Sequence, residues 1–179
     1  MKSSPLLMAL FMMVMDFSSA QTSSASTKPV VVKPSNAAKT VIALPPGVEP
    51  IQFQAADVTF KGKVTRTVKL ELALDDAQQS RGLMYRPALE KNSGMLFLNS
   101  RMQSGAFWMK NTLISLDIAY FDATGKINDI LQMMPCAADP CPSYPPKAPY
   151  IGAVEMNLGW FKKAGIKVGD TVSFRLKFW

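Results

Sequence analysis

The sequence contains no histidine. This absence excludes the Ser-His-Asp and Cys-His catalytic arrangements, the HExxH zinc site and a histidine proton shuttle near neutral pH. Any catalysis would have to use Asp, Glu, Lys, Tyr, Ser or Cys side chains. We therefore expect a binding protein rather than an enzyme, although a carboxylate-based enzyme stays open.

Dense clusters of basic residues are also missing. The chain has 20 Lys and Arg against 13 Asp and Glu, a formal net charge of +7, but its basic residues are scattered and no run exceeds Lys162-Lys163. A surface that follows a phosphate backbone needs clustered cations, so we expect no nucleic-acid partner.

Apolar runs are too short to cross a bilayer, which takes ~20 residues. The run at residues 6–15 follows Lys2 and precedes the small residues Ser18-Ser19-Ala20, a pattern typical of a signal peptide at residues 1–20. A buried helix is the alternative. The pattern predicts a periplasmic or secreted protein with no transmembrane segment after cleavage.

Residues 21–50 are rich in Ser, Thr, Ala, Pro and Lys. They lack a periodic apolar pattern, so we interpret them as a flexible tether. The folded domain is then residues 51–179.

Strand patterns dominate this domain. Residues 64–74 alternate between polar and apolar side chains, which indicates a strand with one buried face, and Lys61-Gly62 before them suits a hairpin turn. Further strands are expected at residues 94–98, 106–109, 116–121, 126–133, 150–156 and 171–176.

Two short helices interrupt the strands. Asp75 is suited to cap the first, with Gln78 as its capping-box partner and Gly82 at its end. Asn157 is expected to cap the second, at residues 158–164. The domain is thus predicted to be mainly β: a small antiparallel β-barrel-like or sandwich domain of about seven or more short strands with two short helices.

Cys136 and Cys141 are the two cysteines, in a proline-rich loop. In an exported chain they are expected to form a structural disulfide, with a stabilisation of about 2 kcal/mol for so short a loop. A redox pair, or a copper(I) site with Met133 and Met134, is the alternative. We expect no metal and no cofactor.

Polar residues beside apolar strands form the candidate site. Asp117 and Glu155 lie within apolar runs, where a buried carboxylate must be paired or hydrogen-bonded. Two interpretations stay open: structural ion pairs, or a ligand-binding pocket. The residues of that pocket would be Trp108, Met109, Lys110, Asn111, Asp117 and Glu155, with Arg81 and Arg86 as supporting cations.

Several linked motifs carry a family resemblance. They are Arg81-Gly82-Leu83-Met84-Tyr85-Arg86, Gly94-Met95-Leu96-Phe97, Phe107-Trp108-Met109-Lys110-Asn111-Thr112, Leu116-Asp117-Ile118, Pro135-Cys136 and residues 155–159. In order and spacing they resemble the family catalogued as domain of unknown function 192 (DUF192), over about residues 64–174. The resemblance implies a small, β-rich, barrel-like domain, frequently with an export signal, and implies no activity, cofactor or catalytic residue. Ser115 departs from the family, which usually has proline there.

Three function classes follow. The first is non-catalytic binding of a small molecule, glycan or peptide in the cell envelope. The second is a hydrolase or lyase using Asp117 and Glu155, which requires their carboxyl groups to lie about 5 to 9.5 Å apart across an open cleft. The third is an interaction module that binds an envelope partner.

Overall fold

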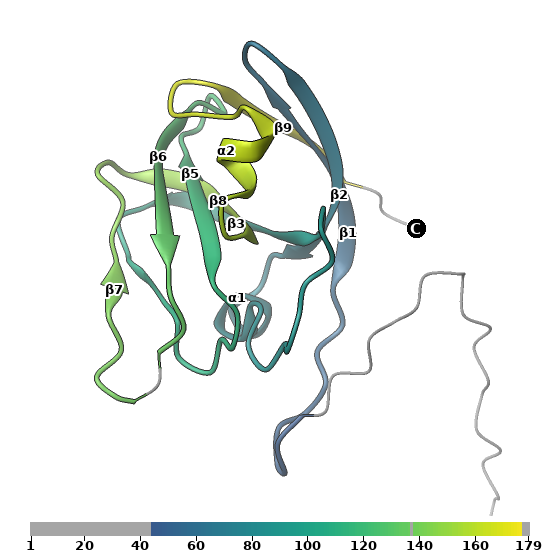
Figure 1. Cartoon of the computed structure of the whole chain (residues 1–179), viewed down its shortest axis with the longest axis vertical. Helices are drawn as coiled ribbons and strands as arrows, with labels where there is room; N and C mark the ends of the chain where they lie inside the picture. Colours follow the sequence, from purple (N-terminus) through teal and green to yellow (C-terminus); the bar gives the residue numbers. More distant parts are fainter. Residues whose placement is uncertain (1–43, 137, 177–179) are drawn as a thin grey trace, which may run out of the picture. The chain divides into compact units, whose positions relative to one another are not determined.

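The computed structural model describes residues 44–136 and 138–176. The expected signal peptide and residues 21–43 of the expected tether lie outside these ranges. Within them the protein is mainly β, with nine strands and two short helices (Figure 1). No helix of the described part is long and apolar enough to cross a membrane.

Seven strands form one sheet, in the order β6-β5-β8-β3-β2-β1-β9. Their bounds are Gln54–Lys61 (β1), Thr65–Ala73 (β2), Gly94–Gln103 (β3), Leu116–Phe121 (β5), Ile127–Met133 (β6), Tyr150–Asn157 (β8) and Thr171–Leu176 (β9). A separate two-stranded sheet pairs Phe107–Trp108 (β4) with Ser143–Tyr144 (β7). The expected strands are confirmed, whereas β7 carries no clear strand pattern in the sequence.

The seven-stranded sheet curls but does not close. Its edge strands β6 and β9 approach one another where Lys126 forms an antiparallel bridge with Thr171. The Ile127 amide donates to the Asp170 carbonyl at 2.8 Å beside this bridge. The result is barrel-like, in agreement with the predicted fold class.

One pair of neighbouring strands departs from the antiparallel expectation. β2 and β3 are parallel, with Leu72 opposite Leu96. A hairpin cannot join parallel strands, so the chain crosses between them through α1, Asp76–Arg81, and a following loop. The other neighbouring pairs of this sheet are antiparallel.

The expected capping of α1 is confirmed. Asp75 accepts a hydrogen bond from the Gln78 amide at 2.8 Å, and the Gln78 side chain accepts one from the Asp75 amide, so the capping box is complete. Gly82 ends the helix as expected, with a φ of 45° and a ψ of −133°, but this is not the left-handed helical conformation that the sequence suggests for it.

The expected cap of α2 is wrong. α2 spans Trp160–Ala164, and its N-cap is Gly159 in the left-handed conformation. Asn157 ends β8 instead, and its amide group donates to the carbonyls of Leu89 and Glu90 at 3.2 and 2.8 Å. These hydrogen bonds join the end of β8 to the loop before β3, and the sequence around Asn157 does not predict them.

Both faces of the sheet are covered, which explains why all six residues of β5 are buried. On one face, α2 contributes Trp160 and Phe161 to a cluster that we call the first core. The opposite face carries the second core. The first core includes Phe60, Leu70, Leu72, Phe121, Val154 and Met156, and the second includes Leu83, Met95, Phe97, Met109, Ile118 and Tyr120.

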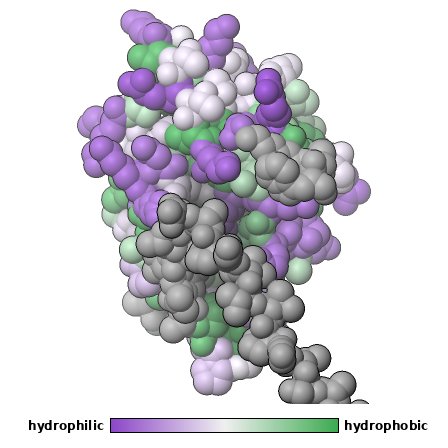
Figure 2. Space-filling view, turned by 90° about the vertical axis from the view of Figure 1, so that its right-hand side faces the viewer, coloured by the Kyte–Doolittle hydropathy of each residue, from purple (hydrophilic) through white to green (hydrophobic). Residues whose placement is uncertain are grey.

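Figure 2 shows part of the surface of the described residues, coloured by hydropathy. There, hydrophobic residues occur in small areas among hydrophilic ones. Scattered apolar residues are normal for a protein surface.

Candidate functional site

The sheet separates the two carboxylates that the sequence singled out. In the pairing of β5 with β8, Asp117 lies opposite Met156 and Ile118 lies opposite Glu155. Directly opposed residues share a face of a sheet, and successive residues alternate between faces. Asp117 therefore points to the first core and Glu155 to the second. Two carboxylates on opposite faces cannot flank one substrate bond.

Glu155 is a buried carboxyl group, 5% exposed. Met95 and Ile118 lie opposite it on the neighbouring strands. Burial raises the pKa of Glu155 from 4.5 to about 8, and the nearby Arg86 guanidinium only partly opposes that rise. Glu155 is thus mostly protonated, and neutral, at pH 7.

Arg86 is engaged elsewhere, which explains why it does not hold Glu155 ionised. Its guanidinium forms a two-pronged ion pair with the Glu71 carboxylate, at 2.7 and 2.6 Å. Its guanidinium carbon also lies 5.9 Å from the centre of the Phe53 ring. Arg86 therefore serves as a structural cation for Glu71 and as a weaker neighbour of Glu155.

Hydrogen bonds between Tyr85 and Asn111 join the loop after α1 to the loop after β4. They are the two non-glycine residues with positive φ in the described part, at 62° and 58°. The Tyr85 amide donates to the Asn111 carbonyl at 2.8 Å, and the Asn111 side-chain amide donates to the Tyr85 hydroxyl at 2.9 Å. These paired bonds hold a left-handed backbone conformation that is uncommon for tyrosine and that asparagine adopts more readily.

Arg81 belongs to the same corner of the molecule. Its guanidinium carbon lies 5.7 Å from the centre of the Tyr85 ring. It also donates to the Glu49 carbonyl at 2.9 Å. Arg81 thus fastens the segment before β1 to the end of α1, rather than pairing with either buried carboxylate.

The two residues predicted to form the walls of the pocket, Trp108 and Met109, lie in different environments. Met109 is buried in the second core, whereas Trp108 is 51% exposed. The Lys110 amine lies 5.7 Å from the centre of the Trp108 ring and pairs with Asp139 at 2.9 Å. The structure therefore does not gather these residues with Asp117 and Glu155 around one cavity. Whether any of them binds a ligand stays a prediction.

Asp117 has none of its expected cationic partners. It is 3% exposed, and its Oδ1 atom has no hydrogen-bond partner among the described residues. The candidate cations Arg81, Arg86 and Lys110 bind other groups, as described above. The structural ion-pair interpretation of Asp117 thus lacks support in the described part.

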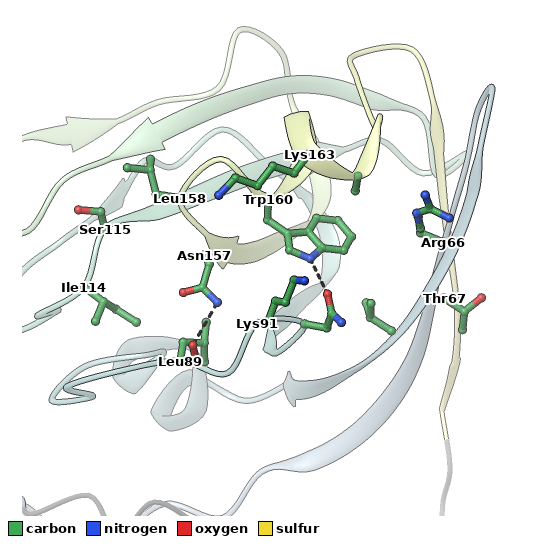
Figure 3. A pocket seen from close by; sticks show the side chains of 13 residues that line it. Arg66, Thr67, Leu89, Lys91, Ile114, Ser115, Asn157, Leu158, Trp160 and Lys163 are labelled. Atoms are coloured by element: carbon green, nitrogen blue, oxygen red, sulfur yellow. Dashed lines mark hydrogen bonds between the residues drawn. The ribbon is translucent and has the colours of Figure 1, made fainter.

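A groove of about 960 Å³ runs beside α2 (Figure 3). Five separate segments build it: β2, the loop before β3, the segment before β5, the end of β8 and α2. Its lining residues are Arg66, Thr67, Val68, Leu89, Lys91, Asn92, Ile114, Ser115, Asn157, Leu158, Trp160, Lys163 and Ala164.

Most of these lining residues were missed in the sequence. Each segment contributes at most three consecutive residues, so no motif joins them. The sequence distinguishes Ser115 only because the family usually has proline there, and Lys163 only because it belongs to the longest run of basic residues. Neither feature predicts a position in a groove. Trp160 next to Phe161 reads as core, which is correct for most of its ring.

The expected disulfide is present between Cys136 and Cys141. It closes the loop that follows β6, and Asp139, the partner of Lys110, lies within that loop. The loop therefore supports the position of the Lys110 amine over Trp108.

Two solved structures resemble this chain. A protein from Sinorhizobium meliloti 1021, proposed to be a transcription regulator, is 27% identical with a TM-score of 0.63, and the match covers 70% of this chain and 98% of that one. A protein of unknown function from Novosphingobium aromaticivorans DSM 12444 is 32% identical with a TM-score of 0.64, over 74% of this chain and 94% of that one. No curated protein matches. The sequence model of DUF192, described as Uncharacterized ACR, matches residues 56–174, and the chain therefore belongs to this family.

Proposed function

We propose that this protein is a non-catalytic domain that binds a small molecule in the groove beside α2. The groove itself carries the proposal. Its volume of about 960 Å³ suits a small ligand, since ligand pockets measure roughly 300–1,000 Å³. Seven of its thirteen lining residues are polar or charged and six are apolar, so the groove offers both apolar surface and polar groups to a ligand.

The buried carboxylates favour binding over acid–base catalysis. A glycosidase-like pair needs both groups in one cleft, and Asp117 and Glu155 lie on opposite faces of the sheet. Neither residue lines the groove.

The proposed place of action is the periplasm or the extracellular space. The N-terminal signal pattern and the Cys136–Cys141 disulfide support it, because disulfides persist in oxidising compartments. N-terminal sequencing of protein from the envelope fraction should find Gln21 as the first residue. Intact Met1 on protein recovered from the cytoplasm would contradict export.

A ligand screen by thermal shift tests the binding role. A ligand at 100 times its Kd stabilises the native state by about 2.7 kcal/mol. Ala164→Trp should abolish the effect, because Ala164 lines the groove and a larger side chain would fill it. Lys162→Trp is the matched control, on the same helix but outside the lining. Stabilisation that survives Ala164→Trp would place the ligand elsewhere.

A further inference from the structure

The charge and the hydrogen bonding of the groove narrow the class of ligand. We infer that the ligand is a small amphiphilic anion, an apolar body that carries a carboxylate, sulfate or phosphate group. This inference rests on the proposed function, because it names the substance that the same groove would bind.

The groove carries only positively charged side chains among its ionisable lining residues. Arg66, Lys91 and Lys163 line the groove, and no Asp or Glu is among its lining residues. None of the three cations forms an ion pair with a carboxylate of the described residues. Cations without a carboxylate partner attract an anion without first having to release one.

These cations lie on different sides of the groove (Figure 3). Lys163 extends from α2 on one side of the groove, Lys91 extends from the loop on the other side, and the Trp160 ring lies between them (Figure 3). Arg66 lies at the end of the groove, on β2. An anionic group bound near Trp160 would therefore have Lys163 on one side and Lys91 on the other.

Three of the uncharged polar side chains in the lining, those of Trp160, Asn92 and Asn157, already form hydrogen bonds within the protein. The Trp160 indole N–H donates to the Asn92 side chain at 3.2 Å. The Asn157 side-chain amide donates to the carbonyls of Leu89 and Glu90. A sugar-like ligand needs many free hydrogen-bond donors and acceptors. These side chains already use several of theirs in hydrogen bonds within the protein.

The groove also has an apolar part. Val68, Leu89, Ile114 and Leu158 line the groove and are only partly buried. Burial of such surface favours binding in proportion to the area removed from water. An inorganic anion would leave this surface wet, whereas an anion with an alkyl or aromatic body would cover it.

Three ligands of equal chain length separate the contributions: octanoate, 1-octanol and octylammonium. Their affinities can be followed by the fluorescence of Trp160 after Trp108 and Trp179 are replaced by phenylalanine. We expect octanoate to bind about tenfold more tightly than 1-octanol, and octylammonium to bind more weakly than either. Added salt should weaken the binding of octanoate and not that of 1-octanol.

Lys162 and Lys163 provide a matched pair of variants. Lys163→Met should weaken octanoate binding by about five- to tenfold, which corresponds to the loss of about 1 to 1.4 kcal/mol from one charged contact, and should leave 1-octanol unchanged. Lys162→Met, on the neighbouring residue outside the lining, should change neither.

The outcomes distinguish this inference from the proposed function. Equal affinities for octanoate and 1-octanol, both lost in Ala164→Trp, would overturn the anionic class while leaving a ligand-binding groove. No binding of any of the three would overturn the amphiphilic class, and the wider screen would then decide the binding role separately. Sedimentation with phosphatidylglycerol vesicles in the absence of octanoate binding would also overturn it, in favour of a membrane surface.

Discussion

Replacement of Glu155 by glutamine should change how the stability of this protein depends on pH. Glu155 is buried in the second core and its pKa is raised from 4.5 to about 8, chiefly by the loss of hydration. Glutamine keeps nearly the same shape but cannot ionise. The comparison therefore isolates one titration, because all other titrating groups are common to both proteins.

Whether the free energy of unfolding rises or falls with pH depends on which state, folded or unfolded, binds the proton more tightly. Between pH 4.5 and 8 the folded protein keeps the Glu155 proton while the unfolded chain loses it, so the free energy of unfolding falls as pH rises. Below pH 4.5 both states are protonated, and above pH 8 both are ionised, so the contribution is flat. At about 1.4 kcal/mol per pH unit, the wild type should lose roughly 3–4 kcal/mol between pH 5 and pH 8 from this group alone.

Urea unfolding at pH 5, 6, 7 and 8 measures this difference. The wild type should lose about 3 kcal/mol or more relative to Glu155→Gln across that range. Any constant cost of the amide cancels, since only the change with pH is compared. Parallel profiles for the two proteins would refute the reasoning and would mean that Arg86 or bound water keeps Glu155 ionised in the fold.

Three further substitutions test other parts of the structure, each by urea unfolding at pH 7. Asp117→Asn should cost less than about 1 kcal/mol because no described cation pairs with Asp117, and a loss of 3–5 kcal/mol would reveal a buried ion pair. Replacement of Cys136 and Cys141 by serine should lower the free energy of unfolding by about 2 kcal/mol, and native protein should show no free thiol on titration. Asp75→Ala should cost about 1 kcal/mol through loss of the capping box, while Asp75→Asn should retain most of that stability.

Local features of the fold could be predicted because local signals produce them. The alternation of residues 64–74 predicts β2, and in the structure less buried and more buried positions alternate from Val68 to Leu72. The Asp75 side chain and the Gln78 side chain meet within one helical turn, so their spacing is enough to predict the cap. The same holds for the Cys136–Cys141 disulfide, where five residues of separation bring the partners together.

Features that depend on strand pairing could not be predicted. Asp117 and Glu155 lie on opposite faces of the sheet because Asp117 pairs with Met156, the residue next to Glu155. A shift of the pairing by one residue would put both carboxylates on the same face, and the sequence does not determine this register. The groove has the same origin, since Arg66, Lys91 and Lys163 come from segments far apart in the sequence. Asn157 was misread because its partners, the carbonyls of Leu89 and Glu90, are supplied by a distant loop.

The pairing of β1 with β9 has a consequence for protein engineering. Ala56 lies opposite Leu176 in adjacent antiparallel strands, so the chain enters and leaves this sheet at neighbouring points. A domain with adjacent ends can be inserted into a surface loop of a host protein without separating the two halves of that loop. The same geometry favours circular permutation, in which a short linker joins β9 to β1 and new ends are opened in an exposed loop, such as Ser104–Gly105–Ala106 between β3 and β4.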